Sequence, residues 1–348
     1  WLLRFMSLSK TMVSMMEPPL AILVGPTAVG KTALSLPVAQ ALQAEVLNVD
    51  SRQLYRYMDI GTAKPTLAEQ AQVPHHLLNL LRPDQRTNAA QFVQAARRAL
   101  DDIHARGKRV LIVGGSGLYL QALIYGLMPA PTAHEPLRRA LRAHAEAYGA
   151  ADLHRWLQHL DPEAASSYHP NDRVRLIRAL EVIMLTGERF SVHRHRHQRQ
   201  GALYPYVAVG LTRERTELYA RIAERTEAML SNGWLAEVEA LLARGYTRAC
   251  SAMNSLGYRE LLAYLDGECA WSDTVHTIIK STRQLAKRQL TWFRKLPHLS
   301  WLSLTGLDEQ AAVAQVLDRL QWPLLPESPP SPSGQGLLPQ DRQPRNGP

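Results

Sequence analysis

The chain has few cysteines and no long uninterrupted apolar segment. Two cysteines, Cys250 and Cys269, among 348 residues are too few for a disulfide framework or a four-cysteine zinc site, which favours a reducing compartment. No apolar run reaches the length of a transmembrane helix or of a signal-peptide core. The composition therefore predicts a cytoplasmic protein that does not cross a membrane.

Lysine is also scarce. Seven of the 40 Lys and Arg residues are lysines, so 33 are arginines, and the formal net charge is +9. Arginine makes bidentate contacts with phosphate, so this excess is compatible with a nucleic-acid partner. A GC-rich genome that favours arginine codons explains the bias equally well, and the composition alone leaves both explanations open.

The hydrophobic pattern predicts the fold class. Short apolar runs that are typical of buried parallel strands alternate with segments of helical periodicity, which indicates a doubly wound α/β layer. Pro37 is expected to kink the first helix, over 32–42, or to loosen its first turn. We expect strands at 20–24, 45–49, 110–113 and 206–211 and near Trp301, and helices at 89–105, 214–230, 234–243 and 273–295.

The same pattern divides the chain into parts. Residues 132–203 are predicted to form a helical insertion, in which the tract from His193 to His197 is interpreted as an exposed linker. Residues 321–348 hold eight prolines and are expected to form a disordered tail. The fold class is thus α/β, a P-loop NTPase-like parallel sheet flanked by helices, with a helical insertion. We assign 1–17 to an N-terminal extension, and 18–131 with 204–320 to the α/β core.

A phosphate-binding loop follows the first predicted strand. Its sequence fits G-x-x-x-x-G-K-[ST] between a strand and a helix, which is the context that this motif needs. Its glycines let successive backbone amides face an anion, Lys31 adds a positive charge, and Thr32 can hold Mg²⁺. A glycine turn before a helix is the less favoured explanation. The motif predicts a di- or triphosphate site at Gly25, Pro26, Thr27, Ala28, Val29, Gly30, Lys31 and Thr32.

Asp50 lies at the end of the second predicted strand. In α/β sheets, ligands bind at the carboxyl ends of the strands, so this carboxylate is a candidate general base or Mg²⁺ partner. The alternative is a structural role as the cap of the next helical turn. A phosphate loop alone does not indicate whether phosphate is transferred, hydrolysed or released as a leaving group.

Several segments occur in the same order in one known family. Besides the phosphate loop these are Asp50 to Tyr55, Met58 to Pro65, Pro74 to Leu77, Val113 to Tyr119, His169 to Arg178, Leu256 to Arg259 and Thr282 to Gln289. Over about residues 20–320 the chain resembles the tRNA dimethylallyltransferases, also called isopentenyl-tRNA transferases, of the bacterial MiaA type.

This resemblance implies an enzyme that transfers a dimethylallyl group from dimethylallyl diphosphate to N6 of the adenosine 3′ of the anticodon, position 37, in tRNAs that read codons starting with U. Asp50 then matches the family's base, and Lys31 with Mg²⁺ at Thr32 stabilises the leaving diphosphate. Ser116 stands where many relatives carry Thr and keeps a catalytic hydroxyl. Further diphosphate contacts are expected from Arg215, Arg283 and Lys287.

The resemblance also implies a tRNA-binding surface for the anticodon stem-loop. Taking the adenosine out of its stack costs a few kcal/mol, which contacts in a pocket offset. Arg175 and Arg178 are three residues apart and are predicted to share a helix face. The positions that match the family's tRNA contacts are Asp50, Ser51, Arg52, Gln53, Ser116, Arg138, Val174, Arg175, Leu176, Ile177, Arg178, Asn254, Ser255, Leu256, Gly257, Tyr258 and Arg259.

Three other functions share some of these features. A P-loop small-molecule kinase would place ATP in the loop but leaves the insertion and the arginines unexplained. A dimethylallyltransferase acting on free adenine nucleotides would need the loop and Asp50 but not Arg138, Arg175, Arg178 or Arg259. A non-enzymatic RNA-binding module would not need the complete loop. The tRNA transferase is favoured, and a monomer is expected.

Overall fold

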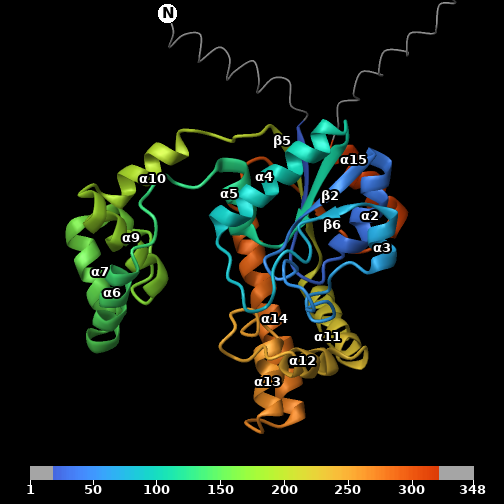
Figure 1. Cartoon of the computed structure of the whole chain (residues 1–348). Helices are drawn as coiled ribbons and strands as arrows, with labels where there is room; N and C mark the ends of the chain where they lie inside the picture. The colour runs from blue at the N-terminus through green and yellow to red at the C-terminus, as the bar shows by residue number, and fades with distance from the viewer. Residues whose placement is uncertain (1–18, 321–348) are drawn as a thin grey trace, which may run out of the picture.

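The computed structural model describes residues 19–320 as a parallel sheet covered by helices, with a second group of helices beside it (Figure 1). The predicted N-terminal extension and Pro-rich tail lie outside these residues. Among the described residues, no helix has the length and apolarity to cross a membrane. All strand pairs are parallel and run in the order β3-β2-β4-β1-β5-β6, which confirms the predicted α/β class.

The strands read as almost continuous apolar runs because both faces of the sheet are covered. In β1 the side chains of Ala21 and Leu23 join the core on one face, and those of Leu20, Ile22 and Val24 join the core on the other. The strands are β1 Leu20–Val24, β2 Ala44–Val49, β3 His75–His76, β4 Arg109–Gly114, β5 Tyr206–Thr212 and β6 Leu299–Ser303.

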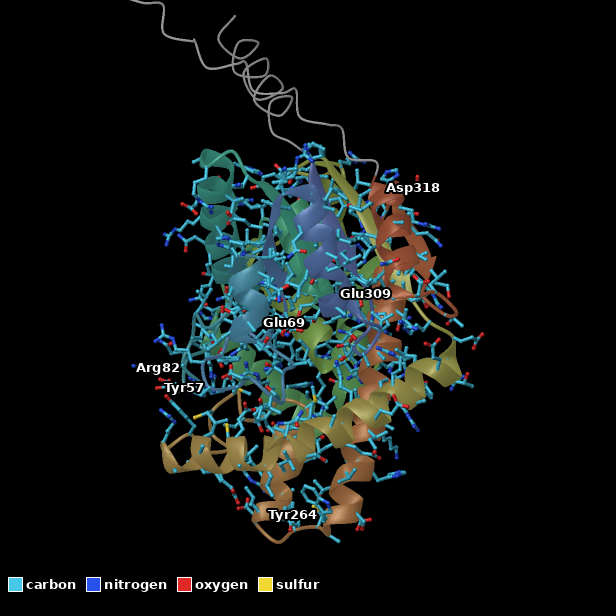
Figure 2. All side chains as sticks on the ribbon, turned by 90° about the vertical axis from the view of Figure 1, so that its right-hand side faces the viewer. Tyr57, Glu69, Arg82, Tyr264, Glu309 and Asp318 are labelled. Carbon is cyan, nitrogen blue, oxygen red and sulfur yellow. The ribbon has the colours of Figure 1, made fainter. Side chains whose placement is uncertain are left out.

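Helices cover both faces of the sheet and extend beyond one end of it. In Figure 1, α4 and α5 lie on one side, α2, α3 and α15 lie on the other, and α11 to α14 reach below the sheet. Figure 2 shows Glu69 and Glu309 on the same side of the molecule and Tyr264 at the far lower end. These helices are α2 Lys31–Leu42, α3 Leu67–Gln72, α4 Ala89–Ala105, α5 Gly117–Tyr125, α11 Arg215–Ser231, α12 Trp234–Ala243, α13 Tyr258–Leu265, α14 Trp271–Phe293 and α15 Glu309–Leu320.

The residues between α5 and β5 form a separate helical group, at the left in Figure 1. This group has its own apolar cluster, which includes Leu141, Leu153, Leu176 and Leu180. A region with its own core can move as a unit relative to the sheet. Its helices are α6 Glu135–Tyr148, α7 Ala150–Leu160, α8 Pro162–Ser166, α9 Arg173–Thr186 and α10 Phe190–Gln198.

Several local expectations were wrong. The tract from His193 to His197 is helical in α10, because Glu163 and Glu188 pair with its basic side chains. The segment around His75 and His76 contributes β3, because its backbone pairs with β2. Four short elements, α3, β3, α5 and α13, were missed because they are too short to show a clear periodic pattern.

Candidate active site

A cavity of about 730 Å³ lies at the carboxyl ends of β1, β2 and β4. Parallel sheets bind ligands at this end because the loops after neighbouring strands converge there. Thr27 follows β1, Asp50 follows β2, and Ser116 follows β4, so three segments distant in sequence meet in one wall. Helices α11 and α14 complete the cavity with Arg225, Met229, Leu285, Arg288 and Gln289.

The phosphate loop has the backbone conformation of an anion cradle. Ala28 and Gly30 both have positive φ, 65° and 112°, which turns successive amides toward one side. The Lys31 ammonium donates to the carbonyls of Gly25, at 2.9 Å, and Pro26, at 2.8 Å. Burial lowers the pKa of Lys31 to about 8, although the nearby Asp50 carboxylate opposes that shift. The loop therefore holds a buried cation that an anionic ligand would stabilise.

Three arginines hold the loop from the side of β5 and α11. Arg213 Nε donates to the Val29 carbonyl at 3.0 Å, and Arg221 Nε donates to the Ala28 carbonyl at 3.1 Å. Arg225 Nη2 donates to Thr27 Oγ1 at 2.5 Å. Burial lowers the pKa of Arg225 to about 10, with Asp50 acting in the opposite direction.

Arg225 also lines the cavity, and the sequence analysis missed it. Its spacing of four residues from Arg221 places the two side chains on one helix face, which was the available signal.

Asp50 follows β2 and Ser116 follows β4, so the two residues lie side by side where these paired strands end. Asp50 Oδ1 accepts a hydrogen bond from the Arg52 amide at 2.8 Å, and Ser116 Oγ accepts one from the Ser51 amide at 2.9 Å. One oxygen of Asp50 therefore caps the following turn, which is the structural role that the sequence left as an alternative. Its second oxygen has no hydrogen-bond partner among the described residues, and the residue faces the cavity.

Gln289 links two of these loops, and the only earlier sign of it was its place in a segment that matches the family. Its Oε1 accepts from the Thr27 amide at 2.8 Å, and its Nε2 donates to the Gly115 carbonyl at 3.0 Å. Gly115 and Gly117 permit this approach, because an added Cβ would lie 2.4 Å from Gln289 and 2.0 Å from Trp292 respectively. Helix α14 therefore sets the spacing between the phosphate loop and the β4 turn.

The structure does not bring Arg215, Arg283 and Lys287, which were predicted to contact the diphosphate, to the phosphate loop. These side chains line a second cavity, of about 410 Å³, and none of them lines the cavity that holds Thr27 and Asp50. Arg215 and Arg283 both stack on Tyr219, at 5.2 and 5.0 Å from the ring centroid. On α14, positions 283 and 287 point away from the face that carries Gln289, so these two sets cannot share one ligand.

The predicted tRNA contacts in the α/β core include both exposed and buried residues. Arg52, Asn254 and Arg259 are exposed and line the large cavity, together with Ser51, Ser255, Leu256 and Tyr258. Gln53 is buried, and its amide donates to the carbonyls of Thr62 and Ala63 at 3.0 Å each. Gly257 is buried beneath Trp234. Gln53 and Gly257 thus make contacts within the protein, and their contacts with RNA stay predictions.

The contacts predicted in the insertion also divide by exposure. Val174 is 80% exposed and Arg175 is exposed at the start of α9, but Leu176 and Ile177 belong to the apolar cluster of the insertion. These two residues cannot reach RNA without unfolding the helix.

The buried carboxylate of Glu181 binds the two other arginines of the predicted surface. Arg138 and Arg178 donate to it at 2.8 and 2.6 Å. Their charges are partly neutralised by this carboxylate.

The described residues hold no group of three His, Cys, Asp or Glu side chains suited to a metal ion. This arrangement is compatible with Mg²⁺, which keeps several waters and usually takes one carboxylate together with substrate phosphates. Thr32 is the second residue of α2, next to the loop, and Asp50 is close enough to Lys31 to raise its pKa. Thr32 and Asp50 are therefore the residues that could hold such an ion.

The fold and the site define a P-loop-type enzyme in which a phosphate cradle opens into a cavity beside one carboxylate. A family model described as IPP transferase matches residues 53–296. The chain is 47% identical to tRNA dimethylallyltransferase 2 of Geotalea uraniireducens, over 81% of this chain and 91% of that protein. It is 46% identical to the tRNA dimethylallyltransferase of Symbiobacterium thermophilum, over 88% and 97%. The chain belongs to the IPP transferase family and is an enzyme.

Solved structures agree with this family. The tRNA isopentenylpyrophosphate transferase of Bacillus halodurans is similar with a TM-score of 0.65 and 38% identity, over 88% of this chain and 97% of that one. A eukaryotic dimethylallyltransferase acting on tRNA is similar with a TM-score of 0.74 and 27% identity, over 89% and 82%.

Proposed function

We propose that this enzyme transfers the dimethylallyl group of dimethylallyl diphosphate to N6 of adenosine 37, next to the anticodon of tRNA. The observation that carries the proposal is the junction of a phosphate cradle with Asp50 and Ser116 in one cavity of about 730 Å³. Neither a kinase nor a non-enzymatic RNA-binding module accounts for the family membership, and neither is retained.

The phosphate loop receives the diphosphate of the donor. Loop amides, Lys31 and Arg225 surround the position where negative charge increases as the C1–O bond of the donor breaks. Preorganised donors lower the barrier because they need no reorganisation when the charge appears. Burial depresses the pKa values of Arg225 and Lys31, so binding the leaving group offsets the cost of burying them.

Asp50 takes the proton that the acceptor loses. The exocyclic amine uses its lone pair to form the bond from N6 to C1, and one N6 proton moves to the free oxygen of the Asp50 carboxylate. The electron pair of the broken C1–O bond leaves with the diphosphate. The bond from the Arg52 amide to the other carboxylate oxygen fixes the direction of the free one.

The tRNA reaches this carboxylate from the exposed rim of the cavity. Arg52, Asn254 and Arg259 are exposed there, and exposed arginines at such a rim suit phosphate contacts with RNA. The insertion would hold the anticodon stem through Val174, Arg175 and the two arginines that contact Glu181. The acceptors we propose are tRNAs that read codons starting with U.

The remaining properties follow the same proposal. Mg²⁺ held by Thr32, Asp50 and the donor phosphates would neutralise the charge on the diphosphate. We propose a cytoplasmic monomer, in keeping with a tRNA substrate.

The test incubates the purified chain with Mg²⁺, labelled dimethylallyl diphosphate and either unmodified tRNA or AMP, followed by nucleoside mass analysis. We expect prenylated adenosine in tRNA alone. Asp50→Asn should abolish transfer, because the carboxylate acts on the acceptor proton. Prenylated AMP would instead assign the chain to the free-nucleotide class, and product formed by the Asp50 variant would refute the role of this carboxylate.

A further inference from the structure

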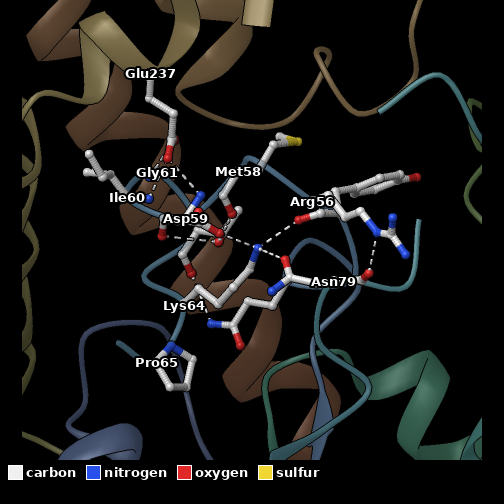
Figure 3. Close-up of polar contacts among 12 residues, drawn as sticks. Arg56, Met58, Asp59, Ile60, Gly61, Lys64, Pro65, Asn79 and Glu237 are labelled. Atoms are coloured by element: carbon white, nitrogen blue, oxygen red, sulfur yellow. Dashed lines mark hydrogen bonds and ion pairs between the residues drawn. The ribbon is translucent and has the colours of Figure 1, made fainter. Parts of the chain in front are cut away.

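Glu237 on α12 binds a turn that lies 176 to 178 residues earlier in the chain. Its Oε2 accepts from the amides of Asp59 and Ile60, both at 2.7 Å, and its Oε1 accepts from the Gly61 amide at 3.2 Å. The hydroxyl of Tyr258 donates to the same Oε1 at 2.6 Å. Figure 3 shows the carboxylate pointing down onto the turn. Three successive amides that face one anion form a nest, which orders the backbone around that anion.

Further hydrogen bonds hold the turn on the side away from Glu237, so the turn forms one unit. The buried Lys64 ammonium donates to the Tyr55 carbonyl at 2.7 Å, to Asp59 Oδ1 at 2.5 Å and to Asn79 Oδ1 at 2.7 Å (Figure 3). Gln53 donates to two carbonyls of the same segment. These bonds make the segment rigid, whereas the hydrogen bonds to Glu237 join it to α12.

Trp234 lies between this turn and the start of α13. An added Cβ on Gly61 would lie 1.9 Å from the indole Nε1, and one on Gly257 would lie 2.0 Å from the indole ring. Trp234 is 2% exposed and meets Tyr258 edge to face at 5.7 Å. The position of the indole is therefore set by the two backbone segments that Glu237 and Tyr258 hold together.

This assembly forms the apolar end of the catalytic cavity. Gly61, Trp234, Leu256 and Tyr258 line the cavity together with Met229. Met229 is one helical turn beyond Arg225 on α11, a rise of about 6 Å. A donor whose diphosphate lies at Thr27 and Arg225 can therefore place its apolar carbons against this wall.

We propose that Glu237 is a positioning residue, which fixes the wall of Trp234, Met229 and Leu256 so that it receives the short prenyl chain of the donor. This inference rests on the proposed function, since it assigns the carbons of that donor to a place in the cavity. Glu237 does not touch the substrate. It acts by holding the Asp59–Gly61 turn and the Tyr258 hydroxyl in one arrangement.

The test compares the binding of dimethylallyl diphosphate with that of inorganic diphosphate, which has no carbon chain. In Glu237→Gln, one of the two acceptor oxygens becomes an amide nitrogen, so at least one of the four donors loses its partner. Affinity for the prenyl donor should fall roughly tenfold, while affinity for inorganic diphosphate should stay unchanged. Hydrogen exchange should become faster at the amides of Asp59, Ile60 and Gly61. The matched control is Glu239→Gln, an exposed position on the same helix, which should change none of these quantities.

Tyr258→Phe provides a second, milder variant, because it removes one of the four bonds and keeps the ring. It should weaken donor binding in the same direction and by less, and it keeps the test decisive if Glu237→Gln does not fold. Equal losses for both ligands, or no loss for either in a variant with faster exchange at the turn, would overturn the proposal. Binding is measured without tRNA, so an absence of prenyl transfer by the unaltered enzyme counts against the proposed function and not against this inference.

Discussion

The buried ammonium of Lys31 makes a quantitative prediction about pH. Burial in the phosphate loop lowers the pKa of Lys31 to about 8 from its ordinary value of 10.5. A bound diphosphate stabilises the charged form, so the ligand binds best to the protonated lysine. Affinity is therefore full below about pH 8 and is lost as the pH rises through that value. One unit above the pKa, roughly one lysine in ten is protonated, and the affinity should be about tenfold lower.

The assay is calorimetric titration of the enzyme with inorganic diphosphate between about pH 6.5 and 9.5. Lys31→Met serves as the reference, because the diphosphate and the rest of the protein titrate equally in both proteins. The ratio of the two affinities should be constant at low pH and should fall above pH 8. Binding near pH 9 should also take up close to one proton, which is measured by repeating the titration in buffers of different ionisation enthalpy. A ratio that does not vary with pH would refute the reasoning.

Two further predictions concern Arg225 and Glu181. Arg225→Ala should weaken diphosphate binding by about tenfold or more, because a charge-assisted contact is lost. Arg283→Ala should leave diphosphate binding unchanged. An equal loss of affinity in both variants would support the sequence-based assignment of Arg283 to the diphosphate site. Glu181→Gln should destabilise the insertion by about 3 kcal/mol in urea unfolding, since it leaves Arg138 and Arg178 without their buried partner. Burial alone would raise the pKa of Glu181, but hydrogen bonds from these arginines lower it to about 2. The contribution of Glu181 to the free energy of unfolding should therefore be complete above pH 4.5 and disappear as the pH falls toward 2. A free energy of unfolding that does not change over this range would contradict the prediction.

The sequence was sufficient where the information is local. The phosphate loop was identifiable because the chemistry of anion binding demands two glycines, a lysine and a hydroxyl within eight consecutive residues. The buried strand β1 and the long helices α4 and α12 were found with their observed bounds because their periodicity spans the whole element. Asp50 was found for a similar reason, since its position directly after β2 places it at the ligand-binding edge of any parallel sheet.

Only the tertiary structure decided which basic side chains face the loop. Helices α11 and α14 both carry arginines on more than one face, and their packing turns Arg225 and Gln289 inward while Arg283 and Lys287 face the second cavity. The burial of Gln53 and the contact between Glu237 and the Asp59–Gly61 turn depend on segments far apart in the chain. Local sequence determines what a segment can bind, because that follows from its own atoms. Which face of a helix meets that segment depends on how the whole core packs, which is a property of the complete fold.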